Sequence, residues 1–392
     1  MGSIRFLCVT GLFAVLSMVT GFFLPVYFRD DLGFTGVQIG FLFAMQAVTV
    51  MLASAPAGMG NDRVSSRFFI VLGLMGQALG LVLMATVESF IPYVLVFFVW
   101  TLANGLFRVS LDVQALKITS GEERLAGVYR YQLSRYVGAT LGAVGAGTLL
   151  SLVDFRVALV AAAVAMTALS MVAVRLPPTR VAPVRFANYR DDLRNPRVIL
   201  LVVWLVLFST HWGAEFTSYG LFLQQDLHLS WTGMGGYIAA EHLAVVLMLA
   251  WFLRRPRHEL NIKRLAFWGL LASGVGHVGM VFQPLWLSVL FRMVHGVGDG
   301  AIFLVFFLGV PKLFAVERLG GHAGLVHLMS MLGMVLGSLI YGPLGEAAGY
   351  AVPLWSSGMI SCLLAGVMVV AGLQGNRRTA GRPGEIPPGV VR

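Results

Sequence analysis

Ionisable side chains stand inside two long apolar stretches of this 392-residue sequence, where a lipid bilayer would disfavour charge. Arg108 and Asp112 lie in one stretch, and Arg292, His295 and Asp299 lie in the other. An ionised side chain near the bilayer centre costs roughly 3 kcal/mol, so such residues face a bundle interior or a water-filled cavity. Carboxylates, imidazole and guanidinium groups can bind polar solutes and exchange protons. The sequence therefore predicts a polar pathway through a membrane.

The composition is that of an integral membrane protein, because 58% of the residues are hydrophobic and only 12% are charged. About twelve apolar stretches are each long enough to cross the hydrocarbon core as a helix. A lipid-exposed strand edge would leave backbone groups unpaired, so we expect an all-α polytopic protein. The expected spans are residues 4–28, 37–57, 68–87, 92–116, 129–152, 157–174, 198–223, 232–252, 265–282, 285–311, 322–344 and 352–373.

The formal net charge of +10 comes from basic residues that gather in alternate loops. These loops hold Arg63 and Arg67, Lys117 and Arg124, residues 175–197, residues 254–264, Lys312 and Arg318, and Arg377 and Arg378. The opposite loops carry mixed or acidic residues such as Asp30, Asp31 and Glu88. This is the positive-inside pattern, and it predicts a multi-pass protein of the inner (cytoplasmic) membrane with both termini in the cytoplasm. The charge thus argues against a nucleic-acid partner.

The chain is predicted to divide near its middle. Residues 176–197 contain proline, arginine and aspartate and are typical of a cytoplasmic linker. A six-helix bundle is expected on each side, in residues 1–175 and in residues 198–392, and the second ends in a short cytoplasmic tail. Residues 123–125 (Glu-Arg-Leu) recur as residues 317–319, about half a chain length later. A duplicated six-helix unit is a known plan of secondary transporters.

The turn after the second expected span carries the most specific motif. Gly58 is followed by Asp62, Arg63 and Arg67 in a pattern that resembles G-x-x-x-D-R-x-G-R-[KR], the signature of the major facilitator superfamily. Ser65 stands where the family has glycine. The resemblance implies the twelve-helix major facilitator fold, and it implies a gating role for these four residues as a latch between helices.

Other residues resemble the lactose permease-like, nucleoside–proton and phenylpropionate-type symporters. Residues 135–138 are similar to the R-x-x-G of the fifth helix, and residues 292–295 to the [KR]-x-x-H of the tenth. This resemblance implies that Asp112 is the substrate-pairing carboxylate and that Asp299 lies near the proton-carrying carboxylate. It also implies that Glu241 corresponds to a substrate-binding glutamate of the eighth helix.

The depths of these residues support the same assignment. At about 1.5 Å per residue, Asp112 and Arg135 reach similar heights on adjacent helices and are expected to pair. The pair is either a substrate contact or purely structural, and Glu241 either contacts substrate or bonds to a neighbouring helix. We interpret His242 and His277 as packing histidines. The predicted proton-coupling residues are Asp299, His295 and Arg292. The predicted substrate-binding residues are Asp112, Arg135, Glu241, Arg108, Glu215, His211 and Asn104.

The sequence contains no phosphate-binding loop, dinucleotide turn or clustered metal motif. We therefore expect no enzyme activity, no cofactor and no metal site. The prediction is a secondary active transporter, a monomer, that carries a small polar solute, a sugar or nucleoside, together with protons. The alternatives are proton-driven efflux of an amphipathic drug or lipid, and a membrane receptor that does not transport.

Overall fold

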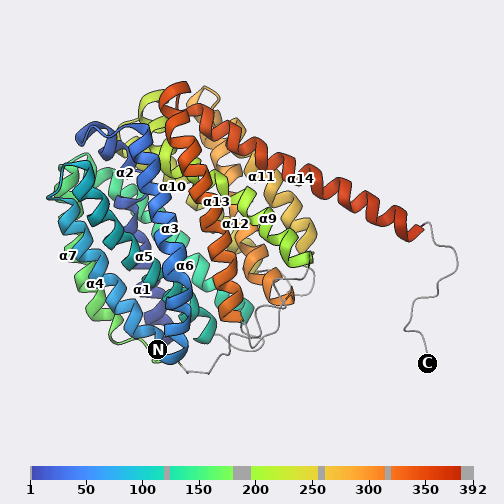
Figure 1. The fold of residues 1–392 in the computed structure, drawn as a ribbon, viewed down its shortest axis with the longest axis horizontal. Helices are drawn as coiled ribbons and strands as arrows, with labels where there is room; N and C mark the ends of the chain where they lie inside the picture. The colour runs from blue at the N-terminus through green and yellow to red at the C-terminus, as the bar shows by residue number, and fades with distance from the viewer. Residues whose placement is uncertain (1, 119–123, 180–195, 255–260, 314–318, 381–392) are drawn as a thin grey trace.

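The computed structural model describes residues 2–118, 124–179, 196–254, 261–313 and 319–380, and the regular elements in these ranges are helices (Figure 1). The first half contains α1 (Gly2–Ser17), η1 (Met18–Thr20), α2 (Leu24–Val26), η2 (Tyr27–Asp31), α3 (Gly36–Arg63), α4 (Ser66–Met84), α5 (Phe90–Ile118), α6 (Arg124–Leu150) and α7 (Phe155–Ala173). The second half contains α9 (Pro196–Ala214), η5 (Glu215–Tyr219), η6 (Phe222–Asp226), α10 (Trp231–Leu253), α11 (Ile262–Gly279), α12 (Leu285–Leu313), α13 (Leu319–Ala348) and α14 (Ala351–Ala380).

Each expected span coincides with one helical segment of this structure. Two of the segments are composite: η1, α2 and η2 continue α1, and η5 and η6 continue α9. Pro25 lies in the first of these composites, and its missing N–H interrupts regular α-helical bonding. Among the described residues, ten segments are long and apolar enough to cross a membrane. Helices α6 and α11 are not among them, and α6 carries Arg130 and Arg135.

Local sequence explains where several helices begin. Thr35 caps α3, because its hydroxyl accepts the Gln38 N–H while the Gln38 side chain accepts the Thr35 N–H. Ser230 caps α10 in the same way by accepting the Gly233 N–H. The Asn261 side chain accepts two backbone N–H groups at the start of α11. These polar residues fix the ends of segments whose apolar interiors would fit many registers in a bilayer.

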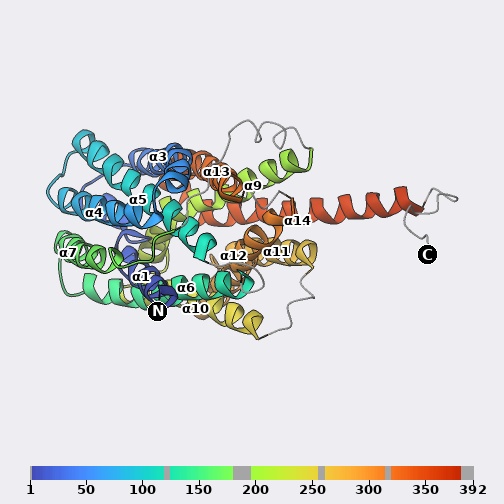
Figure 2. The same cartoon turned by 90° about the horizontal axis from the view of Figure 1, so that it is seen from below.

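Two bundles meet along two pairs of helices. In the first half α4 packs against α5 and α7, α1 against α6, and α3 against α5. In the second half α11 packs against α12 and α14, α9 against α13, and α10 against α12. The halves join where α3 contacts α13 and where α6 contacts α10, and Figure 2 shows these two seams on opposite sides of the molecule. The boundary at residues 176–197 stays a prediction, because residues 180–195 lie outside the described ranges.

The halves are tied together at the end opposite the N-terminus in Figure 1. Glu346 of α13 accepts a hydrogen bond from Arg29 at 2.5 Å and another from the Gly36 backbone N–H at 2.7 Å. Gln224 donates to Asp30 at 2.6 Å. Aromatic contacts lie at the same end, where Phe22 meets Phe216 and Tyr219, and Phe23 meets Trp231. We call this end, defined by residues 22–36, 216–231 and 346, the closed end.

The α6–α10 seam depends on glycine, and this gives a first prediction. A methyl group built on Gly235 would lie 2.5 Å from the Ala143 carbonyl oxygen and 3.1 Å from the Gly147 Cα. Gly235→Ala must therefore push the two backbones apart, and we expect a loss of about 1–3 kcal/mol in stability, read as a lower Tm of the purified protein. Gly236→Ala is the matched control, because no atom lies within 4 Å of its added methyl group. Equal Tm changes in the two variants would contradict the prediction.

Candidate functional site

A buried charged cluster occupies the second half, and Arg292 of α12 lies at its centre. The Arg292 guanidinium contacts Glu215 at 2.6 Å through Nη1 and Glu241 at 2.6 Å through Nη2. Its Nε donates to Glu241 at 2.8 Å, and its Cζ lies over the Tyr219 ring, 4.1 Å from the ring centre. Glu215 begins the π-helical segment η5, a wide turn of a kind that often occurs at functional sites. One cation is thus held between carboxylates from two other helices.

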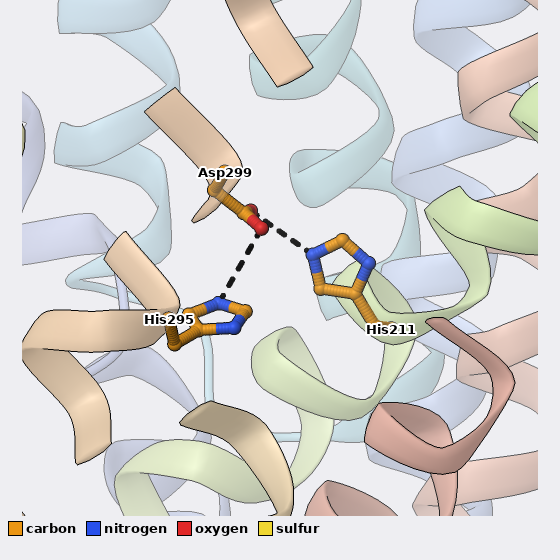
Figure 3. Close-up of side chains that lie close together, drawn as sticks. All are labelled: His211, His295 and Asp299. Atoms are coloured by element: carbon orange, nitrogen blue, oxygen red, sulfur yellow. Dashed lines mark hydrogen bonds and ion pairs between the residues drawn. The ribbon is translucent and has the colours of Figure 1, made fainter. Parts of the chain in front are cut away.

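Asp299 forms the second part of this cluster, one turn beyond His295 on α12. Its carboxylate lies 3.1 Å from His211 Nε2 and accepts the Ser273 hydroxyl at 2.7 Å. The His295 Nε2 is 3.8 Å from the other side of the carboxylate. Figure 3 shows both imidazole rings directed at Asp299, one from α9 and one from α12. All four side chains are buried.

His277 of α11 joins the same cluster. Its ring stacks on His295 with a centroid separation of 4.4 Å, and its Nε2 is 3.7 Å from Glu215 Oε1. Our interpretation of His277 as a packing histidine is therefore incomplete, since it adjoins the charged centre. Ser273 precedes it by one helical turn and was not expected in the site. The sequence feature that could have identified Ser273 is its i, i+4 spacing from His277, which places two polar residues on one face of an otherwise apolar helix.

The described residues also include two sets of three side chains whose ligand atoms lie within 4.8 Å of one another. These sets are His211, His295 and Asp299, and Glu215, His277 and His295. Imidazole nitrogens and carboxylate oxygens are ligands for a divalent transition metal. The guanidinium of Arg292, 2.6 Å from Glu215, opposes a second cation beside that carboxylate. Protons can also compensate the negative charge of these groups, because each carboxylate has a hydrogen-bonding neighbour.

The residues predicted to bind substrate thus separate into two groups. Glu241, Glu215 and His211 contact the predicted proton-coupling residues Arg292, His295 and Asp299. Asp112, Arg135, Arg108 and Asn104 lie in the first half, on α5 and α6. The separation arises because the seventh and eighth spans turn their acidic residues towards α12.

In the first half, the partner of Asp112 is Tyr131 and not the expected Arg135. The Tyr131 hydroxyl donates to Asp112 at 2.5 Å. Arg135 donates to Gln132 at 3.3 Å and lies 5.8 Å from the centre of the Tyr131 ring. The ion pairs of the described residues do not include the expected Asp112–Arg135 pair. Asp112 is satisfied by a phenol on the same helix as Arg135, so the guanidinium keeps donors for another group.

Helix α5 places Arg108 one turn from Asp112 and from Asn104. Arg108 is exposed although it lies within a membrane-crossing segment, whereas Asn104 is buried. The accessible guanidinium of Arg108 lies near the half-buried Asp112 and Arg135, and these three side chains form the charged group of the first half.

The motif predicted to gate the transporter lies where α3 ends and α4 begins. Arg67 donates to the Leu176 carbonyl at 3.2 Å and so ties this turn to the segment after α7. Gly58 lies in α3 with no atom within 4 Å of an added methyl group, so close helix approach does not explain this glycine. The side chains of Asp62 and Arg63 lie outside the described residues. The latch stays a prediction.

Comparison with known proteins decides the family. The model described as Major Facilitator Superfamily matches residues 6–262. The chain belongs to the major facilitator superfamily. The Staphyloferrin B transporter of Staphylococcus aureus (strain NCTC 8325 / PS 47) is 28% identical over 167 residues, which are 41% of this chain and 38% of that protein. The match thus spans less than two thirds of the curated relative.

Solved structures agree on the fold of this superfamily member. The nucleoside transporter NupG superposes with a TM-score of 0.71 at 16% identity, over 94% of this chain and 98% of that one. The human organic anion transporter MFSD10 (TETRAN) superposes with a TM-score of 0.68 at 16% identity, over 93% of this chain and 99% of that one. Identities this low establish the fold alone. The predicted all-α, polytopic major facilitator fold is confirmed, and the chain is a multi-pass membrane transporter of this superfamily.

Proposed function

We propose that this transporter carries a small polar solute, a sugar or a nucleoside, together with protons by alternating access. It works as a monomer in the inner membrane, with both termini in the cytoplasm. The observation that carries this proposal is the buried network in which Arg292, three carboxylates and two histidines from α9, η5, α10 and α12 bond to one another. Histidine and buried carboxyl groups are the side chains best suited to take up and release protons near neutral pH.

The first half supplies groups for the solute. Arg108 is exposed, and Asp112 and Arg135 are half-buried, within segments that the fold encloses. A sugar or nucleoside presents hydroxyl and carbonyl oxygens, which accept hydrogen bonds from guanidinium, and its hydroxyl groups also donate to carboxylate. Solute contact thus falls to Arg108, Asp112 and Arg135, while Glu241, Glu215 and His211 act on the proton network.

Alternating access requires the two six-helix bundles to rock about the α3–α13 and α6–α10 seams. With the termini in the cytoplasm, the closed end faces outside, and its bonds from Glu346 and Gln224 must break for a solute to enter. The turn with Asp62, Arg63 and Arg67 is the corresponding latch on the cytoplasmic side.

The proposal is tested with purified protein in lightly buffered liposomes, to which galactose, uridine and 3-phenylpropionate are added one at a time. Symport predicts external alkalinisation with one compound and none with empty liposomes. Solute uptake without proton movement would refute proton coupling. Extrusion of an amphipathic dye driven by a pH gradient would favour efflux.

Asp299→Asn removes the carboxylate that His211 and Ser273 contact. We expect accumulation of solute driven by a pH difference of one unit to fall at least about tenfold, while downhill exchange of solute continues, because the variant moves fewer protons per solute. Radiolabelled uptake measures both quantities. Asp154→Asn, at the start of α7, is the control and should accumulate solute like the wild type. Full accumulation in Asp299→Asn would remove this residue from coupling.

A further inference from the structure

The hydrogen positions on two histidines follow from their partners. Nδ1 of His211 lies 2.5 Å from the Phe208 carbonyl oxygen, and Nδ1 of His295 lies 2.9 Å from the Ser273 carbonyl oxygen. A carbonyl oxygen only accepts, so each Nδ1 must carry a hydrogen. The Ser273 hydroxyl is 3.3 Å from His295 Nδ1, but it gives its single hydrogen to Asp299 at 2.7 Å.

The other nitrogen of each ring faces a carboxylate. His211 Nε2 is 3.1 Å from Asp299 Oδ2, and His295 Nε2 is 3.1 Å from Glu215 Oε1. With Nδ1 already protonated, a neutral ring would direct its lone pair at an ionised oxygen, and the two atoms would repel. One further proton between the two atoms turns each contact into a hydrogen bond. Each histidine–carboxylate pair therefore calls for one proton.

A charge count gives the same number independently. The titratable and charged groups that face this network are Glu215 and Tyr219 of η5, His211 of α9, Glu241 and Tyr237 of α10, His277 of α11, Arg292, His295 and Asp299 of α12, and the half-buried phenol of Tyr136 on α6. The phenols carry no charge near neutral pH, so three carboxylates stand against one guanidinium, which leaves two negative charges. The carboxylates and the guanidinium are buried, and buried charge without compensation is strongly disfavoured. Two protons make the network neutral.

His277 does not compete for these protons. Its Nδ1 is 3.2 Å from the Ser357 hydroxyl, which gives its own hydrogen to the Leu354 carbonyl at 3.0 Å, so Nδ1 of His277 is the donor. Its Nε2 has no hydrogen-bond partner within the described residues. His277 is therefore neutral, and a second cation stacked on His295 would be repelled.

We propose that the network holds two protons, one in the His211–Asp299 pair and one in the His295–Glu215 pair, and that the transporter moves two protons per cycle. The transport of two protons per cycle rests on the proposed function. The binding of two protons in the resting protein does not depend on it. Ser273 and Arg292 bond to the two carboxylates, so each proton lies on Nε2 and the ring is an imidazolium. On release each Nε2–H bond breaks, the proton passes to water, and a neutral imidazole remains. His211 thereby joins His295 as a proton-carrying residue.

The test is ¹⁵N NMR of the full-length purified protein in detergent, with histidine labelled and no solute added. The chain has 8 histidines, and His211, His277 and His295 are assigned from single glutamine variants. An ordinary histidine titrates near pH 6.5 and is neutral at about pH 8. At that pH we expect imidazolium signals from His211 and His295 and a neutral Nδ1–H signal from His277. A neutral His211 or His295, with no carboxylic acid band in the infrared spectrum that Asp299→Asn or Glu215→Gln removes, would overturn the proposal.

The two possible failures are distinguishable. A protein with both imidazolium signals but without solute-dependent proton movement would refute symport and leave the two-proton network standing. Symport with only one protonated pair would refute the two-proton network alone. If a histidine variant does not fold, Asp299→Asn replaces it: the Asn amide can donate to Nε2, so the His211 imidazolium signal should convert to a neutral one while that of His295 persists.

Discussion

Replacing Arg292 by Gln is expected to destabilise the folded protein by about 3–5 kcal/mol, because removal of one partner leaves the others buried and unpaired. The guanidinium is fully buried and contacts Glu215 and Glu241, each at 2.6 Å. Glutamine cannot replace the charge or reach both carboxylates. Chemical unfolding of the purified protein measures the change.

A double variant distinguishes the effect of unpaired charge on stability from the effect of the altered side-chain shape. Arg292→Gln combined with Glu241→Gln removes one charge of each sign, so it should recover a substantial part of the lost stability. Arg156→Gln is the matched surface control: its guanidinium lies 2.7 Å from Glu88, but both side chains are well exposed, and its loss should change stability little. If Arg292→Gln resembled Arg156→Gln, the cluster would not depend on its central cation.

The second large effect concerns the number of protons. With the membrane potential held at zero and a pH difference of one unit, each proton moved balances about a tenfold solute gradient. The wild type should therefore come to rest against a gradient of about a hundredfold. Asp299→Asn and Glu215→Gln should each rest at about tenfold, because each leaves one carboxylate to be balanced by one proton.

The measurement uses the solute that causes alkalinisation in the liposome test. Its concentration gradient across the liposome membrane is varied until the net flux of this solute is zero. The variant that combines Asp299→Asn with Glu215→Gln leaves Arg292 paired with Glu241 alone, so it should show no coupling and exchange solute only downhill. A resting gradient near tenfold in the wild type would mean one proton per cycle. Unequal single variants would mean that the two pairs do not act alike.

The sequence was sufficient to place the helices and the main charged residues. Spans are legible because lipid requires about a bilayer thickness of apolar residues, whatever the helix packs against. Arg292, His295 and Asp299 could be selected because charge in such a segment needs a partner. The sequence could not predict which residues Glu215, Glu241 and His211 contact, because these contacts depend on how each helix is rotated about its axis.

The expected Asp112–Arg135 pair failed for the same reason, the unknown rotation of each helix about its axis. Rise per residue gave the height of each side chain but not its direction around the helix. Tyr131 lies one turn before Arg135 on α6 and reaches Asp112 first. His277 was interpreted as a packing histidine, and Ser273 was not expected in the site, for a related reason. A lone histidine or serine on an apolar helix is ordinary until a neighbouring helix brings a carboxylate to it.

Glu346 bears on how fast the closed end can open. This one carboxylate holds a side chain, Arg29, and a backbone amide, that of Gly36, and both belong to the opposite half. The two bonds must therefore break together when α13 moves away from α3. Because the Arg29–Glu346 pair is about one third exposed, ions in the medium at the closed end can reach it and screen it. The opening rate should accordingly rise with the ionic strength on that side of the membrane, which makes the salt concentration there a kinetic input to the transport cycle.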